Sequence, residues 1–590
     1  MRLLLVLQVA PGPLPQLHAI WGETDNAFFD AWGRRIAAGD LLQREPWHPM
    51  AAWMRQVARA ALARQPSLAA ELGIAKAGAG DQAVLEQLAW DRWLGGPTFF
   101  QEPGYPYLVG LTYRVFGPDP WPVFAWQLLL GVAGVLVIHR LGRRLFSHVE
   151  GALAGLLAVL APIPLFYEVT LLRDALVVFL TMALALLMAW TVDGPRRRWF
   201  VLGLAFGAAA LVKQTFLAFP LLMAVWRLAA VRSPARDRLA AAGLVLAGLS
   251  LALLPVALRN VTVGVPVLAM NGSALSQLPL FHTAGATPFA VDVDMDYVRV
   301  LLAAKGSAVR GLLEAARTHQ SAWGLMALEA KKAAYAWHGY ESPNNVDFYL
   351  FRLAAPVLSA LPIRVVVLVP LAAIGLARDA GRAWPLLVAI AASLGSVVLG
   401  TALARYRAPL LALLMPLAGA GILTLYRWLA ARRWVPIIAA MLASVPYLVW
   451  AAGDPPGLGA ADRAAAYRRD AEAFAPRSPA LASLQLLEAL RLEPGAKGVE
   501  ERLGQFLLEA NDPEAALQHL DAAVRSSERP AARVLRARAL AEVGRTIEAL
   551  AEVRAALAAE PAVAGGRALR DFLEGQARQA KGATPGGAVP

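Results

Sequence analysis

The sequence predicts a mainly α-helical protein that crosses a membrane many times and ends in a smaller helical domain. Hydrophobic residues make up 58% of the 590 residues, and the mean hydropathy is +0.49. A typical globular chain is only about 45–50% apolar. Apolar runs of membrane-spanning length alternate with short charged turns. From Gly453 onward these runs stop, and alanine, leucine, arginine and glutamate dominate.

The charge pattern agrees with a membrane protein. The formal net charge is +13, but most lysines and arginines stand at the ends of apolar runs, where such residues set membrane topology. We therefore expect a lipid bilayer, and no nucleic acid, as a partner. The chain has no cysteine, which excludes disulfides, thiolate metal sites and cysteine nucleophiles.

The first ten residues are apolar, but Pro11, Pro13 and Pro15 follow them. A spanning helix needs about 20 apolar residues. The segment is therefore expected to be the second half of a first span, in a protein whose true start lies upstream, or else a short anchor. A cleaved signal peptide is disfavoured because no small-residue cleavage site follows.

Residues 21–120 are predicted to form a first outer loop region. Residues 28–32 and 50–64 have amphipathic helical spacing with several tryptophans, which is typical of helices at the membrane interface. Residues 78–80 are predicted to form a loop.

Ten long apolar runs follow, and in all we expect about 10–12 spans. Several runs contain proline, which does not exclude a span because neighbouring helices can satisfy the freed carbonyls. The predicted spans are 121–139, 151–168, 174–192, 199–212, 215–226, 239–258, 355–376, 384–403, 409–426 and 434–450.

Every second turn between these spans is basic, which assigns those turns to the cytoplasm. Asp25, Glu102, a second outer loop at 259–354 and the C-terminal part should then lie on the outer face. The second loop has helical patterning at 297–316 and 322–335, and loops of this length are usually functional.

The C-terminal part divides into an expected linker at 453–475, helical repeats at 476–580 and a disordered tail at 581–590. Glu514-Ala-Ala-Leu517 recurs as Glu548-Ala-Leu-Ala551, close to the roughly 34-residue period of tetratricopeptide helix pairs. Such repeats usually bind a protein partner. A structural cap on the membrane domain is the alternative, and the sequence leaves both open.

Two acids beside the membrane are the candidates for catalysis. Asp25 stands close after the first apolar segment, with Glu23 as an alternative, and Glu102 stands beside Tyr105 and Tyr107. A single outer acid is more often a solvated charge, and tyrosines at this depth often form an interfacial belt. These alternatives stay open on composition alone.

A divalent cation is a possible cofactor. His48 could hold it together with Asp25 and Glu102, since imidazole and carboxylate suit zinc or manganese. Nothing in the sequence requires such a metal.

Five basic residues stand at the outer ends of spans, where membrane proteins carry few of them. Any one of these side chains could extend to the lipid headgroups, but this is a poor explanation for five of them together. A phosphate at this face would explain them, because guanidinium groups bind phosphate through paired hydrogen bonds. The five are Arg173, Lys213, Arg259, Arg405 and Arg407.

These motifs together resemble the GT-C superfamily of membrane glycosyltransferases, which includes protein-mannosyltransferases and aminoarabinose transferases. Asp25, followed by Phe28-Phe29-Asp30 and Gly39-Asp40, is similar to the signature after the first span. Residues 102–107 resemble the E-x-P-x-x-Y element, although Gly104 departs from the usual pattern. Arg405-Tyr406-Arg407-Ala-Pro409 resembles the Arg-Tyr-Arg-x-Pro element. Segments 259–272 and 343–349 resemble outer-loop elements of members with tetratricopeptide tails.

The resemblance covers residues 21 to about 450 and implies the following roles. Asp25 would be the general base, and Glu102, with Tyr105 and Tyr107, would orient the donor or acceptor. One carboxylate suffices because a phosphate leaving group needs no acid. Lys213, Arg405 and Arg407 would hold the phosphate, with Tyr406 beside them and Arg173 and Arg259 as weaker candidates.

The implied enzyme moves a hexosyl or pentosyl group from a polyprenyl-phosphate donor to an extracytoplasmic lipid, glycan or protein. Its place would be a bacterial inner membrane, with the C-terminal domain in the periplasm. The chain has no glycine-rich nucleotide loop, in keeping with a lipid-linked donor. An O-antigen ligase or polymerase is one alternative. A transporter or an anchor presenting the repeats is another, although the sequence has neither paired halves nor mid-span acids.

Overall fold

The computed structural model describes residues 1–75, 81–230, 234–291, 293, 295–455, 457–527 and 529–582. These residues are largely helical, and their one β feature is an isolated bridge between Asn344 and Val346. The chain forms two compact units. Unit 1 consists of Met1–Val6, Leu17–Phe348 and Val357–Gly453, and unit 2 of Leu7–Gln16, Tyr349–Pro356 and the chain from Asp454 onward.

Six helical segments of the described chain are long and apolar enough to cross a membrane. They are α8 (Trp121–Leu145), α11 (Asp174–Val192), α14 (Ala235–Val263), the segment Pro356–Arg378 with α20 (Pro356–Ala360) and α21 (Val365–Arg378), α23 (Ala404–Ala430) and α24 (Trp434–Ala452). A seventh would be the pair Arg2–Val9 (α1) and Leu14–Ile20, which is bent by 80°. The prediction of a mainly α-helical, multi-pass membrane protein is confirmed. The number of spans by this criterion is lower than the expected 10–12.

The difference arises where predicted spans are short or broken. Predicted span 151–168 is two helices, α9 (His148–Val159) and α10 (Pro162–Tyr167). Pro162 lacks the amide hydrogen that would continue α9, and the preceding Ala161 is extended, as residues before proline prefer. Two further apolar helical segments, Gln214–Ala229 and α22 (Trp384–Leu399), are also shorter than a full span.

A second break positions a site residue. Helix α12 (Arg197–Val212) ends at Lys213, whose backbone is extended (φ −153°, ψ 115°). The chain then enters a 3-10 turn, η2 (Gln214–Leu217), and α13 (Ala218–Ala230). Lys213 therefore lies at a helix end and not along a continuous span.

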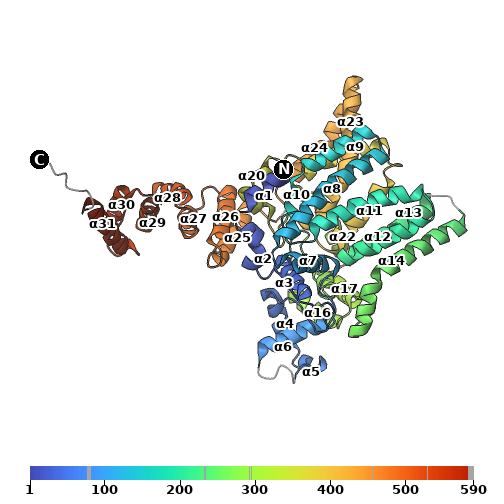
Figure 1. The fold of residues 1–590 in the computed structure, drawn as a ribbon, viewed down its shortest axis with the longest axis horizontal. Helices are drawn as coiled ribbons and strands as arrows, with labels where there is room; N and C mark the ends of the chain where they lie inside the picture. Colours follow the sequence, from blue (N-terminus) through green and yellow to red (C-terminus); the bar gives the residue numbers. More distant parts are fainter. Residues whose placement is uncertain are drawn as a thin grey trace. The chain divides into compact units, whose positions relative to one another are not determined.

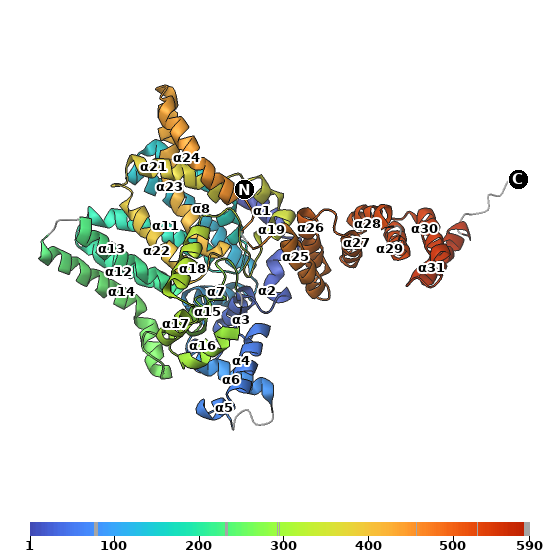
Figure 2. The same cartoon turned by 180° about the vertical axis from the view of Figure 1, so that it is seen from behind.

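The apolar helices of unit 1 pack through small residues. Helices α11, α12 and α14 run side by side (Figure 1; Figure 2). A Cβ on Gly203 would lie 2.1 Å from the Val245 carbonyl oxygen, and one on Gly421 would lie 1.9 Å from that of Leu371. Only glycine permits these backbones to approach so closely, as is common between membrane helices.

One end of this bundle carries most of the short helices of unit 1 (Figure 1; Figure 2). They are α3 (Asp25–Ala37), α4 (Ala52–Arg64), α5 (Leu68–Glu71), α6 (Gln82–Trp93), α7 (Gly104–Phe116), α15 (Ala274–Leu280), α16 (Met295–Ala304) and α17 (Ala308–Ala316). The expected helix at 297–316 is thus two helices, because Lys305 and Gly306 adopt left-handed backbone (φ 46° and 72°). The expected helix at 322–335 is α18 (Ala322–Tyr335). The expected loop at 78–80 lies outside the described residues.

Unit 2 contains a row of helices in which each packs on the next. They are α25 (Ala460–Phe474), α26 (Pro479–Leu492), α27 (Val499–Glu509), α28 (Pro513–Ser527), α29 (Pro530–Glu542), α30 (Thr546–Ala559) and α31 (Gly566–Gly582). Small side chains such as Ala516, Ala539 and Ala549 are fully buried between them. Packing of this nearest-neighbour kind is typical of helical solenoids.

The boundaries of the C-terminal part differ from the expectation at one place. Residues 460–474 of the expected linker form α25, and Tyr467, Ala471 and Phe474 are buried. These residues therefore pack as part of unit 2. Of the expected disordered tail, 583–590 lie outside the described residues.

Candidate functional site

The Asp25 carboxylate is held from three sides at the start of α3. Thr24 caps this helix by accepting a hydrogen bond from the Ala27 amide, so that Asp25 is the first helical residue. Asp25 Oδ1 accepts a hydrogen bond from Gln101 Nε2 at 2.8 Å. Oδ2 accepts one from Asn345 Nδ2 at 3.0 Å and pairs with Arg405 Nη1 at 2.5 Å. The side chain stays 22% exposed.

Asn345 joins the second outer loop to α3. Its Oδ1 accepts a hydrogen bond from the Asp25 amide at 2.9 Å, and its carbonyl accepts one from Asn26 Nδ2 at 3.1 Å. Its backbone is left-handed (φ 63°), a conformation that asparagine tolerates better than most residues. The loop residue thus fixes both the backbone and the carboxylate of Asp25.

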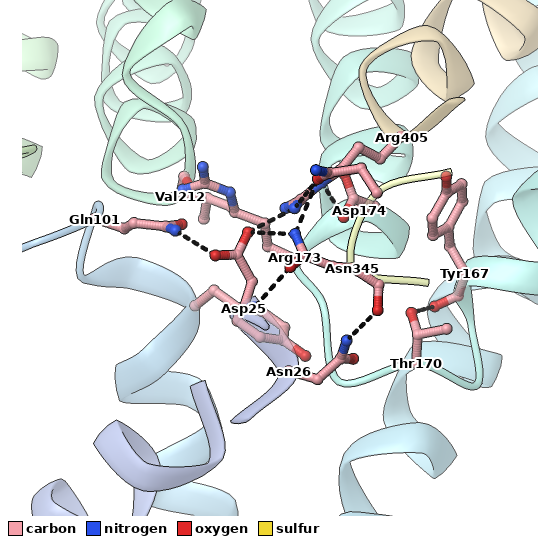
Figure 3. Close-up of polar contacts among 12 residues, drawn as sticks. Asp25, Asn26, Gln101, Tyr167, Thr170, Arg173, Asp174, Val212, Asn345 and Arg405 are labelled. Carbon is pink, nitrogen blue, oxygen red and sulfur yellow. Dashed lines mark hydrogen bonds and ion pairs between the residues drawn. The ribbon is translucent and has the colours of Figure 1, made fainter. Parts of the chain in front are cut away.

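Arg405, at the start of α23, bridges two carboxylates. Besides Asp25, its Nε lies 3.3 Å from Asp174 Oδ2 at the start of α11. Its Nη1 also donates to Asn344 Oδ1 at 3.3 Å. Figure 3 shows Asp25, Asn345 and Arg405 pointing toward one another, with Asp174 beside Arg405. The Arg405 and Asp174 side chains are 2% and 3% exposed, so this ion pair is almost fully buried.

Glu102 and Arg173 form a second buried ion pair. Glu102 Oε1 accepts a hydrogen bond from the Gln214 amide at 2.6 Å, and Arg173 also donates to the Val212 carbonyl at 3.0 Å. Burial alone would raise the pKa of Glu102, but the attraction of Arg173 and the Gln214 hydrogen bond outweigh it and lower the pKa. Glu102 is therefore an ionised group whose two oxygens already have partners.

Gly104 has a steric reason for departing from the family pattern. A Cβ there would lie 2.7 Å from the Leu211 carbonyl oxygen. The start of α7 therefore packs directly on the last turn of α12, and this contact holds Glu102 beside the residues that follow α12.

Lys213 lies between Tyr406 and this set of charges. Its Nζ is 4.4 Å from the centroid of the Tyr406 ring, and the residue is only 9% exposed. The guanidinium carbon of Arg405 is 5.6 Å from the same ring. Within the described chain Lys213 forms no ion pair, whereas Arg173 has one and Arg405 has two. A buried ammonium over an aromatic face is stabilised by a cation–π interaction.

Two of the predicted phosphate ligands use their guanidinium groups on backbone carbonyls. Arg407 donates to the carbonyls of Ala336, His338 and Tyr340. Arg259 donates to the carbonyls of Leu42, Gln43 and Pro97, and its guanidinium carbon lies 4.0 Å from the centroid of the Phe99 ring. These contacts favour a role for both arginines in fixing the loops.

The two predicted tyrosines also bind protein groups. The Tyr105 hydroxyl donates to Gln127 Oε1 at 3.0 Å, and the ring is fully buried. The Tyr107 hydroxyl donates to the Leu41 carbonyl. Of the predicted residues, the structure therefore brings together Asp25, Glu102, Arg173, Lys213, Arg405 and Tyr406.

A cavity of about 750 Å³ lies against Asp25. Glu23, Asn345 and Tyr406 also line it, and Glu23 Oε1 accepts a hydrogen bond from the Ala52 amide at 3.2 Å. The volume is in the range of small-molecule sites, about 300–1,000 Å³.

The metal alternative does not match the geometry. His48 Nδ1 lies 2.8 Å from Asp91 Oδ1, and Glu102 is paired with Arg173. Across the described residues, no three or more histidine, cysteine, aspartate or glutamate side chains converge as they would around a metal ion.

Four residues at the site were not singled out from the sequence: Gln101, Asp174, Asn344 and Asn345. Gln101 and the two asparagines stood inside motifs that were noted for other residues. Asp174 had its own signal, an acid at the first position of a long apolar helix, next to Arg173.

Comparison with known families gives a match to part of the chain. Residues 100–258 match the family model described as dolichyl-phosphate-mannose-protein mannosyltransferase. The matched segment includes Gln101, Glu102, Arg173, Asp174 and Lys213, whereas Asp25, Asn345 and Arg405 lie outside it. The searches of curated proteins and of solved structures found no match. Together with the apolar helices, the match supports a membrane glycosyltransferase of the GT-C type.

Proposed function

We propose that this protein transfers a hexosyl or pentosyl group from a polyprenyl-phosphate donor to an extracytoplasmic acceptor, with Asp25 as the general base. One observation carries the proposal. The Asp25 carboxylate, fixed by Gln101, Asn345 and Arg405, borders a large cavity, close to a buried lysine that forms no ion pair with any described residue.

The hydrogen bonds of Asp25 leave room for a substrate hydroxyl. An ionised carboxylate offers about four acceptor positions. Gln101 uses one on Oδ1, and Asn345 and Arg405 use two on Oδ2. One position on Oδ1 is therefore left for the hydroxyl group of the acceptor, and a base must be within hydrogen-bond reach of the proton that it takes.

The transfer is a single displacement. The acceptor oxygen attacks the anomeric carbon of the donor sugar while its proton passes to Asp25. The bond between that carbon and the phosphate oxygen breaks, and the electron pair leaves with the phosphate. Because this leaving group is already stable as an anion, no second carboxylic acid is needed.

The cations at the site suit a phosphate. Arg173 and Arg405 each form ion pairs with buried carboxylates, whereas Lys213 forms none in the described chain. Burial lowers the pKa of Lys213 to about 7 although Asp174 and Glu102 act to raise it, and a bound phosphate would favour its charged form. Lys213 is therefore the group whose charge is most available to a lipid phosphate, with Arg405 beside it over the same ring. Positive groups placed where charge develops stabilise the transition state.

The positions of the arginine-rich turns support an extracytoplasmic site. The site lies at the start of α11 and α23 and at the end of α12. The basic residues lie at the other ends of these helices, at 196–198 and at Arg427. Since basic turns face the cytoplasm, the site faces outward. We propose that the membrane is a bacterial inner membrane.

The same argument assigns the C-terminal part to the periplasmic side. Helix α24 starts next to Arg432 and Arg433 and ends where the Ala451 carbonyl accepts a hydrogen bond from the Gly339 amide in the outer loop. We propose that unit 2, which follows, is a tetratricopeptide-like scaffold that binds a protein partner.

Glycan analysis of the cell envelope tests the proposed function. Mass spectrometry would compare cells with the gene, without it, and with the gene carrying Asp25→Asn. One glycan should lose a sugar on deletion, regain it with the wild-type gene and not with the variant, at equal protein levels. A profile unchanged by deletion would contradict the proposal and favour a membrane anchor that presents unit 2.

A further inference from the structure

We infer that the cavity beside Asp25 binds an uncharged carbohydrate as the acceptor, that is, an oligosaccharide without phosphate or carboxylate groups. The inference rests on the proposed function and names the acceptor class for the same site. It follows from the charge, the aromatic surface and the hydrogen-bonding groups of the cavity wall.

The charged side chains that line the cavity are both acids. Among the described residues they are Glu23 and Asp25, and the lining includes no lysine, arginine or histidine. Lys213 is outside the lining but lies over the ring of Tyr406, which belongs to it. The phosphate of the donor therefore has a cationic place beside the cavity. An anionic acceptor within it would face the carboxylates of Glu23 and Asp25, and the Arg405 that pairs with Asp25 is not part of the lining.

Aromatic rings form much of the remaining wall. Three half-buried tryptophans leave part of their surface toward the cavity, namely Trp21, Trp47 and Trp53. Trp47 is stacked on Phe28 at 5.1 Å between ring centroids, and Trp53 meets Trp90 edge-on at 5.7 Å. These contacts hold the rings in place. The faces of aromatic rings are negative and so attract the polarised C–H groups of a sugar ring.

The polar groups of the wall fit hydroxyl groups. Gln277 and Asn344 line the cavity. Asn344 keeps its amide nitrogen as a donor while its oxygen accepts from Arg405 and Asn345. The Gln277 amide can both donate and accept hydrogen bonds. Sugar hydroxyls do the same, so each can pair with an amide or with an acid of the wall. The volume of about 750 Å³ exceeds what one sugar ring fills and suits a short oligosaccharide.

A peptide acceptor fits this wall less well. Extended peptides commonly bind by pairing with an exposed strand edge. The elements around the cavity include α3, α4 and α15, whose backbone groups are paired within the helices, and the described chain has no strand beyond the isolated Asn344–Val346 bridge. The wall therefore offers side chains, not backbone, for recognition.

The full-length protein in lipid nanodiscs, with radiolabelled polyprenyl-phosphate mannose as donor, tests the inference. The acceptors would be neutral methyl disaccharides of the gluco, galacto and manno series, their 6-phosphates, and a decapeptide of serine and threonine. At least one neutral disaccharide should be labelled about ten times faster than its phosphate, and the peptide should not be labelled. Trp53→Ala should raise the KM for that disaccharide roughly tenfold, Trp53→Phe should restore it, and the exposed Trp323→Ala should change nothing.

A direct measurement of donor binding distinguishes failure of the acceptor inference from failure of the proposed function. If the donor binds and its sugar goes to the peptide, to the phosphorylated acceptors or only to water, the inference is wrong and the proposed function stands. If the neutral disaccharides show no binding by saturation-transfer NMR, the inference is wrong as well. If neither this donor nor the corresponding polyprenyl-phosphate donors of other hexoses and pentoses bind or are consumed, the proposed function fails, and the inference fails with it.

Discussion

The Asp25 carboxylate and the Arg405 guanidinium lie 2.5 Å apart, although 380 positions separate them in the sequence. The contact joins the short helix α3 to the start of α23, which is among the most buried spans of unit 1. Arg405 also holds Asp174 at the start of α11. A single side chain therefore aligns the proposed base with two long helices of the bundle.

Removing Arg405 should damage both stability and activity. Arg405→Ala would leave the buried Asp174 without its cation, and breaking a buried ion pair costs about 3–5 kcal/mol. Thermal unfolding in detergent should show a markedly lower midpoint, and sugar transfer should be lost. Arg405→Lys keeps the positive charge but cannot reach both carboxylates. Its unfolding midpoint should therefore lie between those of wild type and Arg405→Ala. The exposed Arg433→Ala serves as control, and an Arg405→Ala midpoint equal to that of the control would contradict the structural role.

Lys213 should act mainly on the donor. A hydrogen bond to a charged group contributes about 1.5–3 kcal/mol, so Lys213→Met should weaken donor binding by roughly ten- to a hundredfold. Binding of a polyprenyl-phosphate sugar can be measured by microscale thermophoresis. Lys331→Ala, on the exposed surface of α18, is the matched control. If Lys213→Met binds the donor as tightly as wild type, Lys213 does not bind the donor phosphate.

Asn345 should act on the rate and not on donor affinity. Asn345→Gly keeps the left-handed backbone available and removes the amide contacts to Asp25, each worth about 0.5–1.5 kcal/mol. The kcat should fall roughly ten- to a hundredfold, with the donor dissociation constant unchanged. Asn345→Ala adds backbone strain of about 1–2 kcal/mol and should in addition lower the unfolding midpoint. If Asn345→Gly retains full kcat, the amide does not position the base.

Glu102 should stabilise the fold in a pH-dependent way. Its pKa in the folded protein lies below the ordinary value, so its contribution is present above the unfolded pKa of about 4.3 and is lost as the pH falls through the lower folded value. Wild type and Glu102→Gln should differ in unfolding midpoint at pH 7 and converge only at pH values below about 4. Equal midpoints at pH 7, or convergence well above pH 5, would show that the ion pair with Arg173 does not hold.

The fold class was predictable because long apolar runs and basic turns are local signals. The number of full spans was not, because it depends on where helices end. Pro162 breaks one predicted span into two helices, whereas α12 ends at Val212, where the predicted span 199–212 ends as well.

The sequence predicted which types of residue lie at the site and where they stand in the chain. It did not predict which partners their side chains contact. Successive residues on a helix differ by about 100° in direction, so Arg405 and Arg407 point to nearly opposite sides of α23. One meets Asp25 and the other meets the carbonyls at 336–340. The role of Asn345 depends on a left-handed backbone and on a partner 320 positions away. Neither feature can be predicted from the neighbouring residues in the sequence.

The most direct test of the proposed base is a single-turnover transfer assay with purified Asp25→Asn. The variant keeps the size of the side chain. Its oxygen can still accept hydrogen bonds from Asn345 and Arg405, and its amide nitrogen can donate to Gln101 once the Gln101 amide turns over, but the variant cannot accept the proton. Transfer of labelled sugar from a saturating polyprenyl-phosphate donor should fall by a factor of about 10²–10⁴, while donor affinity and the unfolding midpoint stay near those of wild type. Transfer at the wild-type rate would contradict the assignment of Asp25 as the base.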